Sequence, residues 1–138
     1  MFALACSAAT DTPTGDFDVQ IAQTDASPVG KRGETLARME LAITVTNRTE
    51  YPWRVESVGV QSVTATHFSI PPTPQPWGQM IAPGRSNELA FWTVVQATIN
   101  FSKLTVPMRV KLVLVGPNGE RRSETFTRNM EAWLEPAT

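Results

Sequence analysis

The residue best suited to catalysis or metal binding in this sequence is His67, because it is the only histidine. A Ser-His-Asp hydrolase would need it as the general base, yet no Gly-x-Ser-x-Gly motif accompanies it. Copper accepts imidazole and thioether ligands, so His67 with Met80 or Met108 is a candidate copper site. The alternative, which we favour, is a histidine at the end of a strand beside a loop.

The acidic residues and the glycines do not predict a calcium site or a phosphate-binding loop. Asp16 and Asp18 stand two residues apart and share one face at the start of a strand, but calcium takes roughly six to eight oxygen ligands. A solvated strand start is the better interpretation. Residues 116–119 contain two glycines without the Lys-Ser/Thr pair that a phosphate loop requires. We therefore expect no enzyme activity, no metal site and no cofactor.

The N-terminal segment contains Cys6, the only cysteine of the chain, so no disulfide can form within it. Residues 2–7, Phe-Ala-Leu-Ala-Cys-Ser, resemble the end of a bacterial lipoprotein signal peptide, whose cysteine becomes lipidated. The charged start and longer apolar run of such a peptide are missing, so this interpretation requires that it begin upstream of Met1. Residues 1–16 would then be a signal remnant and a flexible tether. The alternative is that Cys6 is incidental in a frayed N-terminus.

Composition favours a single β-rich domain. With 138 residues, the chain can bury a core without disulfides or metals. The net charge of −1 and the pI of about 5.8 argue against nucleic acid as a partner. No run of about 20 apolar residues could cross a membrane. Thr and Val are frequent, and eleven prolines and eight glycines punctuate the chain, which favours strands joined by tight turns.

Apolar and polar residues alternate along several short segments, as in strands with one buried face. The clearest segment places Met39, Leu41, Ile43 and Val45 on one side. The expected strands are 17–23, 36–46, 53–66, 68–70, 79–82, 88–95, 106–115 and 121–128. Within 53–66 the parity of the apolar residues slips twice, which predicts bulges or a change of sheet.

The turns complete the predicted architecture. Gly116-Pro117-Asn118-Gly119 predicts a hairpin that places Phe126 opposite Val110. The proline-rich stretch 71–78 is expected to be an extended loop, because proline has no N–H for a sheet, and 96–105 to be a crossover with one helical turn. Strands that run up and down in order would gather turns 47–53, 83–87 and 116–119 at one end.

Seven or eight strands at this spacing predict an all-β fold, an immunoglobulin-like antiparallel β-sandwich. The sandwich is expected to span residues 17–130, followed by a C-terminal tail at 131–138.

Two short segments resemble known families. Val45-Thr46-Asn47-Arg48-Thr49 is followed, after a gap, by residues 81–91, Ile-Ala-Pro-Gly-Arg-Ser-Asn-Glu-Leu-Ala-Phe. This pattern resembles the telokin-like domains of bacterial lipoproteins and is similar to the water-stress, late-embryogenesis-abundant type fourteen domain. Both families are immunoglobulin-like sandwiches. The resemblance implies a binding or envelope role outside the cytoplasm and supplies no catalytic residue.

Aromatic residues beside turns are the candidates for a binding surface. Tyr51 and Trp53 flank a turn, and Trp77 follows Pro74 and Pro76. Trp and Tyr are enriched where proteins grip partners, and proline lowers the entropy cost of ordering a loop. The alternative is that these rings close the two ends of the core.

Three functional hypotheses follow. The leading one is a non-catalytic binding or assembly module, held in the cell envelope as a membrane-anchored lipoprotein and contacting a protein partner. The second is a structural accessory subunit of an envelope complex that uses an exposed sheet edge. The third is a copper or redox carrier based on His67 and the methionines.

Overall fold

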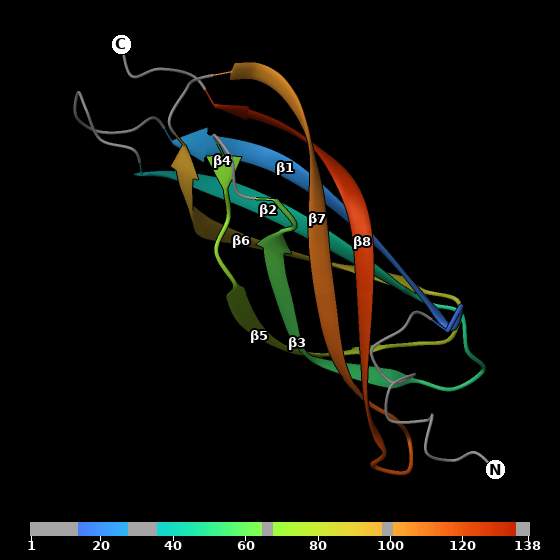
Figure 1. The fold of residues 1–138 in the computed structure, drawn as a ribbon. Coiled ribbons are helices and arrows are strands. Elements are labelled where there is room, and N and C mark those ends of the chain that lie inside the picture. Colours follow the sequence, from blue (N-terminus) through green and yellow to red (C-terminus); the bar gives the residue numbers. More distant parts are fainter. Residues whose placement is uncertain (1–13, 28–35, 65–67, 98–100, 135–138) are drawn as a thin grey trace, which may run out of the picture.

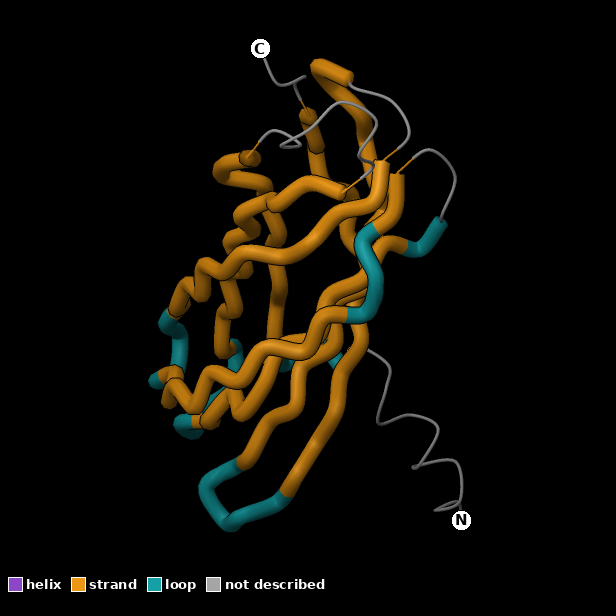
Figure 2. The backbone as a smooth tube through the Cα atoms, turned by 90° about the vertical axis from the view of Figure 1, so that its left-hand side faces the viewer, coloured by secondary structure: helices purple, strands orange, loops and turns teal. Residues whose placement is uncertain are grey.

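The computed structural model of the chain describes residues 14–27, 36–64, 68–97 and 101–134. These residues form strands joined by short turns, and no helix occurs among them (Figure 2). The strands are β1 (Phe17–Ser27), β2 (Leu36–Asn47), β3 (Trp53–Ser62), β4 (Phe68–Ser69), β5 (Thr73–Ile81), β6 (Ser86–Ala97), β7 (Phe101–Val115) and β8 (Arg121–Leu134).

The strands form two four-stranded antiparallel sheets, in the orders β1-β2-β6-β4 and β5-β3-β7-β8. In Figure 1, β1, β2 and β6 lie in one layer while β7 and β8 cross them in the other. The first sheet has the order A-B-E-D of an immunoglobulin domain, and β3-β7-β8 have the order C-F-G. The extra edge strand β5 lies beside β3. The predicted immunoglobulin-like β-sandwich is confirmed.

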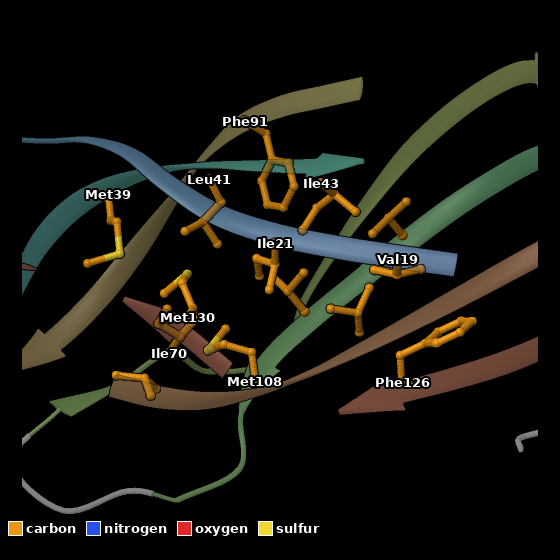
Figure 3. Close-up of a cluster of buried hydrophobic side chains, with 14 of the residues drawn as sticks. Val19, Ile21, Met39, Leu41, Ile43, Ile70, Phe91, Met108, Phe126 and Met130 are labelled. Atoms are coloured by element: carbon orange, nitrogen blue, oxygen red, sulfur yellow. The ribbon is translucent and has the colours of Figure 1, made fainter. Parts of the chain in front are cut away.

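The core lies between the sheets and is built from alternate residues of each strand. Met39, Leu41, Ile43 and Val45 of β2 are buried, as the alternation predicted. In Figure 3, Leu41 and Ile43 of one sheet and Met108 and Met130 of the other point into the same interior. Burying a side chain of this kind stabilises the fold by about 1.5–3 kcal/mol. This core holds the surfaces of both sheets in fixed positions.

The predicted turns gather at one end of the sandwich. Asn47 N–H donates to the Arg85 carbonyl (2.9 Å), and Gly84 N–H donates to the Asn47 carbonyl (2.8 Å), which joins two of the turns directly. A Cβ at Gly116 would run into the ring of Trp53, so the third turn lies there too.

The hairpin between β7 and β8 has the predicted register. Phe126 pairs with Val110. Gly119 has a φ of +81°, which a residue with a side chain rarely adopts. Its N–H donates to the Gly116 carbonyl (3.0 Å) and closes the turn.

One of the two predicted irregularities in residues 53–66 is present. Glu56 is an extra residue of β3 relative to β7, because Val55 pairs with Leu114 and Ser57 pairs with Val113. This bulge explains why Val55 and Val58 are both buried despite opposite parity. The second slip is absent, since β3 ends at Ser62 and Val63 is exposed.

The prediction that 71–78 is a loop is wrong, because residues 73–81 form strand β5. β5 lies at the edge of its sheet and pairs only with β3 among the described strands. Pro74 and Pro76 have the same parity, so both can turn the side that lacks an N–H toward solvent, where no partner strand needs it. The sequence rule against proline in sheets applies to central strands and fails at this edge.

The strands also run further than expected. β7 begins at Phe101, so residues 101–105 are strand and not part of a helical crossover. β8 continues to Leu134, where it pairs with Phe101, so residues 131–134 belong to the sheet and not to a tail. Each extension supplies the other with a partner, a long-range pairing that local sequence patterns do not reveal.

Candidate functional site

One side of the sandwich is closed by bonds between the two sheets. Gln23 of β1 donates through Nε2 to the Trp133 carbonyl and accepts from the Trp133 N–H through Oε1, both at 2.9 Å. Arg128 Nε donates to the Val19 carbonyl (3.0 Å) and its Nη2 to Asp18 (3.2 Å). The edges of β1 and β8 are therefore covered by each other.

The opposite side, between β5 and β6, is open. Among the described strands, β6 pairs with β2 along its length but with β4 only at Phe68↔Ala97 and Ser69↔Gln96. Two side-chain contacts bridge this side: a Thr73–Thr93 hydroxyl pair (2.9 Å) and Asn87 Nδ2 donating to the Met80 carbonyl (3.4 Å). Two hollows flank β5 here, one on each side of the strand.

The first hollow is a cleft between β5 and β6. It has a volume of about 420 Å³ and is lined by Trp77, Gln79, Ser86, Asn87 and Glu88. Trp77 lies where β5 bulges against β3, next to Gly78 with its φ of +77°. Its ring packs partly against the core and stays half-exposed. The cleft thus combines one aromatic surface with amide, hydroxyl and carboxylate groups.

The second hollow is a groove of about 290 Å³ on the outer face of the β5-β3-β7-β8 sheet. Pro72 and Pro74 form its wall, Gly59 lies in its floor, and Arg109 and Lys111 stand beside it. The surface of the groove is mainly apolar, and its polar lining residues are Gln61, Thr73 and Thr125 besides the two cations. It can hold an apolar group next to an anionic one.

The predicted binding residues divide between these surfaces and the core. Pro74 and Pro76 are both exposed on β5. Pro74 lines the groove, and Pro76 directly precedes Trp77 of the cleft. Tyr51 is 60% exposed at the turn before β3. Trp53 is only 8% exposed and meets Phe17 edge-on, with ring centroids 5.5 Å apart. Trp53 therefore closes one end of the core, as the alternative interpretation proposed, and cannot contact a partner directly.

The Asn47 turn beside Tyr51 is fixed from within. Asn47 is fully buried, and its Nδ2 donates to the carbonyls of Tyr51 and Ile81, both at 2.8 Å. Its Oδ1 accepts from the N–H (2.9 Å) and the hydroxyl (2.7 Å) of Thr49. Asn47 thus has a structural role, and it holds Tyr51 in a defined position at the surface.

The acidic residues considered as a calcium pair are engaged in ion pairs. Asp16 lies 3.0 Å from Arg122, and Asp18 lies 3.2 Å from Arg128 and 3.8 Å from Arg48. Asp16 immediately precedes β1 and Asp18 lies within it, and both carboxylates are paired with arginines.

Arg122 belongs to a buried charge cluster next to Asp16. Its Nε lies 3.1 Å from Glu124 Oε2, although the N–H does not point at that oxygen well enough to form a hydrogen bond. Glu124 is fully buried and accepts from the N–H (3.2 Å) and hydroxyl (3.0 Å) of Thr14. The Arg122 guanidinium stacks on the rings of Trp53 and Phe17, 4.7 and 5.3 Å from their centroids. The cluster fastens residues 14–16, expected to be tether, to β8.

One of the two methionines considered as copper ligands lies in the core. Met108 is fully buried in the core, where it contacts no solvent. Met80 is exposed on β5, while His67 and Cys6 lie outside the described residues. Among the residues that the structure describes, no group of three or more His, Cys, Asp or Glu is placed to hold a metal. The described residues also include no helix that could span a membrane.

Comparisons with known proteins agree with the fold. No family model and no curated protein matches the chain. A Northeast Structural Genomics Consortium target is 12% identical, with a TM-score of 0.63 over 89% of each chain. A protein from Archaeoglobus fulgidus is 9% identical, with a TM-score of 0.50 over 87% of this chain and 98% of that one.

A structure described as a late embryogenesis abundant protein is 10% identical, with a TM-score of 0.49 over 87% of this chain and 72% of that one. The expected resemblance to such proteins is thus met only as a distant likeness, which carries no argument. Identities this low show a shared fold and leave function to be argued from the site.

Gly59, Arg109, Lys111 and the open edge of β6 did not emerge from the sequence as site residues. Alternation does place Arg109 and Lys111 on the outer face of their strand. Only the pairing of β5 with β3 and of β3 with β7 brings prolines, glycine and cations together around one groove.

Proposed function

We propose that the chain is a non-catalytic binding module that acts outside the cytoplasm and contacts a protein partner through the open β5/β6 side of the sandwich. A lipid on Cys6 would anchor it to the membrane of the cell envelope. The observation that carries the proposal is the contrast between the two sides. One side is closed by bonds between the sheets, whereas the other leaves two hollows around a proline-stiffened strand.

Trp77 is the expected anchor of this surface. It combines a large ring that is half-exposed with a backbone fixed by pairing to β3. Rigid aromatic side chains in such settings carry a large share of binding energy at protein interfaces. Pro74 and Pro76 restrict the same strand, so little entropy would be lost when a partner binds.

A second candidate function is a structural subunit that adds a strand of a neighbouring protein to its own sheet. The edge of β6 favours it, because residues 86–95 pair only with β2 among the described strands. Unpaired strand edges accept extended peptides through backbone hydrogen bonds. The two candidates share one side of the molecule and differ in whether side chains or backbone dominate the contact.

Site-specific photo-crosslinking in intact cells tests the proposal. A photoreactive residue would replace Gln79 or Glu88 beside the cleft, and Gln20 on β1 or Asn129 on β8 would serve as matched exposed controls. We expect a discrete crosslinked product from the first pair only, and its loss in the Trp77→Ala variant. Equal products from both sides, or none from the open side, would contradict the proposed surface.

The membrane anchor requires a separate measurement. The gene with its upstream region would be expressed in a bacterium, and the intact mass of the membrane fraction determined. We expect a species that begins at Cys6 and carries a diacylglycerol-sized addition. An unmodified species that retains Met1 would remove the lipoprotein part of the proposal and leave the binding surface to be judged alone.

A further inference from the structure

Gly59 lies in the interior of β3, where its own backbone gives no reason for a glycine. It is not among the glycines with positive φ, which in the described part of the chain are Gly15, Gly78, Gly84 and Gly119. A Cβ at this position would lie 3.9 Å from Lys111 Cβ, an ordinary van der Waals contact. Glycine weakens a strand interior, so neither conformation nor packing accounts for it here. Glycines in strands often mark a place where a ligand or another backbone approaches closely.

The missing side chain opens the floor of the groove. Val58 and Val60 are buried, so Gly59 faces the outer surface of the sheet. Across the sheet it pairs with Pro74 on β5 and with Lys111 on β7. The resulting hollow of about 290 Å³ has an apolar wall at Pro72 and Pro74.

The groove is also positively charged. The side chains of Arg109 and Lys111 point outward from β7 and form no ion pair or side-chain hydrogen bond with any described residue. Further along the same face, Arg54 and Arg121 share Glu56, at 3.5 and 2.6 Å. On this face, the two arginines further from the groove thus share a carboxylate, whereas the side chains of Arg109 and Lys111 have no described counter-ion.

We propose that this groove binds an extended acidic segment of a protein partner, whose backbone passes over Gly59 and whose carboxylates pair with Arg109 and Lys111. Side chains two residues apart on a strand are separated by about 6.6–6.8 Å. Acidic residues at positions i and i+2 of an extended segment match that spacing. The residue between them points to the opposite side of the segment, where an apolar side chain would meet Pro72 and Pro74. The inference rests on the proposed binding function and names the chemistry of its partner.

The test uses the full 138-residue chain and a fluorescein-labelled peptide of alternating glutamate and valine, with binding followed by fluorescence anisotropy. We expect saturable binding that weakens as salt is added. Gly59→Val should fill the floor of the groove and abolish binding while the protein stays folded. Arg109→Gln/Lys111→Gln should weaken binding about tenfold or more. The control variant Arg85→Gln/Lys103→Gln has the same net charge and should bind like the parent chain.

Several results would overturn the inference. One is the absence of saturable binding up to about 1 mM peptide, and another is unchanged binding by Gly59→Val. A third is vesicle binding that needs anionic phosphatidylglycerol and both cations but is unaffected by Gly59→Val, which would assign the cations to a lipid surface. If the crosslink from Gln79 persists in any of these cases, the binding function stands and only the acidic partner is wrong. Loss of both signals would reject the two together.

Discussion

At the scale of single residues, Asn47 shows how one polar side chain fixes an end of the sandwich. Its amide bridges its own turn and the end of β5 through the Tyr51 and Ile81 carbonyls, and its carbonyl oxygen holds Thr49. Asn47 itself is fully buried, and each polar atom of its side chain has a hydrogen-bond partner. A buried amide with four partners is specific to Asn, because Asp has no N–H to donate and Gln is too long by one methylene.

Asn47→Ala should lower the free energy of unfolding by about 1–3 kcal/mol, because it removes the side-chain donor of the buried Ile81 carbonyl and the acceptor of the Thr49 N–H. Urea denaturation measures the loss. The control is Asn129→Ala on the exposed part of β8, which should stay within about 0.5 kcal/mol of the parent chain. Equal stability of the two variants would show that the Asn47 network contributes nothing net.

For Gly59 we expect the opposite result, namely that a substitution stabilises the fold. Its φ is not positive and its surroundings tolerate a Cβ, so a β-branched residue should suit the strand better. Gly59→Val is expected to raise the free energy of unfolding by about 0.5–1 kcal/mol. The same denaturation experiment checks it, and a destabilised Gly59→Val protein would mean that the glycine is needed for the fold.

At the scale of elements, β5 and β6 differ in how readily their edges could pair with a further strand. β5 carries Pro74, Pro76 and the bulge at Gly78, three features that discourage further strands from adding to an edge. β6 has no proline between Ser86 and Ala97, and its register with β2 is unbroken. The exposed Trp92 and Val94 lie on its outer face. β6 is thus the edge of the described strands best able to pair with another chain.

Amide hydrogen exchange should reveal this edge directly. Every second N–H of β6 is bonded to β2, and the intervening ones face the open side, so protection should alternate along residues 86–95. The N–H groups of β2, which lies between β1 and β6, should be protected throughout. Two-dimensional NMR in deuterium oxide measures both strands at once. Uniform protection along β6 would mean that its edge is already covered.

At the scale of the whole molecule, the two sides of the sandwich differ in how the sheets are joined. The β1/β8 side holds the sheets together through polar contacts between residues about a hundred positions apart, such as Gln23 with Trp133. The proposed binding surface lies on the other side of the same core, where the two hollows flank β5.

The two hydrogen bonds between Gln23 and Trp133 form a clamp between the sheets. Removing this clamp should weaken the fold without altering the open side. Gln23→Ala leaves the Trp133 N–H and carbonyl without partners and should cost about 1–3 kcal/mol of unfolding free energy. Gln20→Ala on the exposed face of the same strand is the matched control and should cost less than about 0.5 kcal/mol. Both variants should retain the crosslink from Gln79. A stable Gln23→Ala protein would show that the clamp is not needed.

The sequence by itself determined the features that depend on near neighbours. Alternation over 36–46 set the buried face of β2, and the Gly116–Gly119 turn set the pairing of Phe126 with Val110, because the side-chain period and the turn geometry are local properties. The bulge at Glu56 was visible as a parity slip for the same reason.

Tertiary structure alone decided the rest. Pro74 and Pro76 became strand residues because β5 lies at an edge, and whether a strand is central or at an edge depends on the whole sheet. Trp53 turned inward because Phe17 and Arg122, distant in sequence, meet it there. Gly59, Arg109 and Pro74 form one groove only through pairing across three strands. Such contacts depend on which strands become neighbours, and the periodicity of a single segment carries no information about that choice.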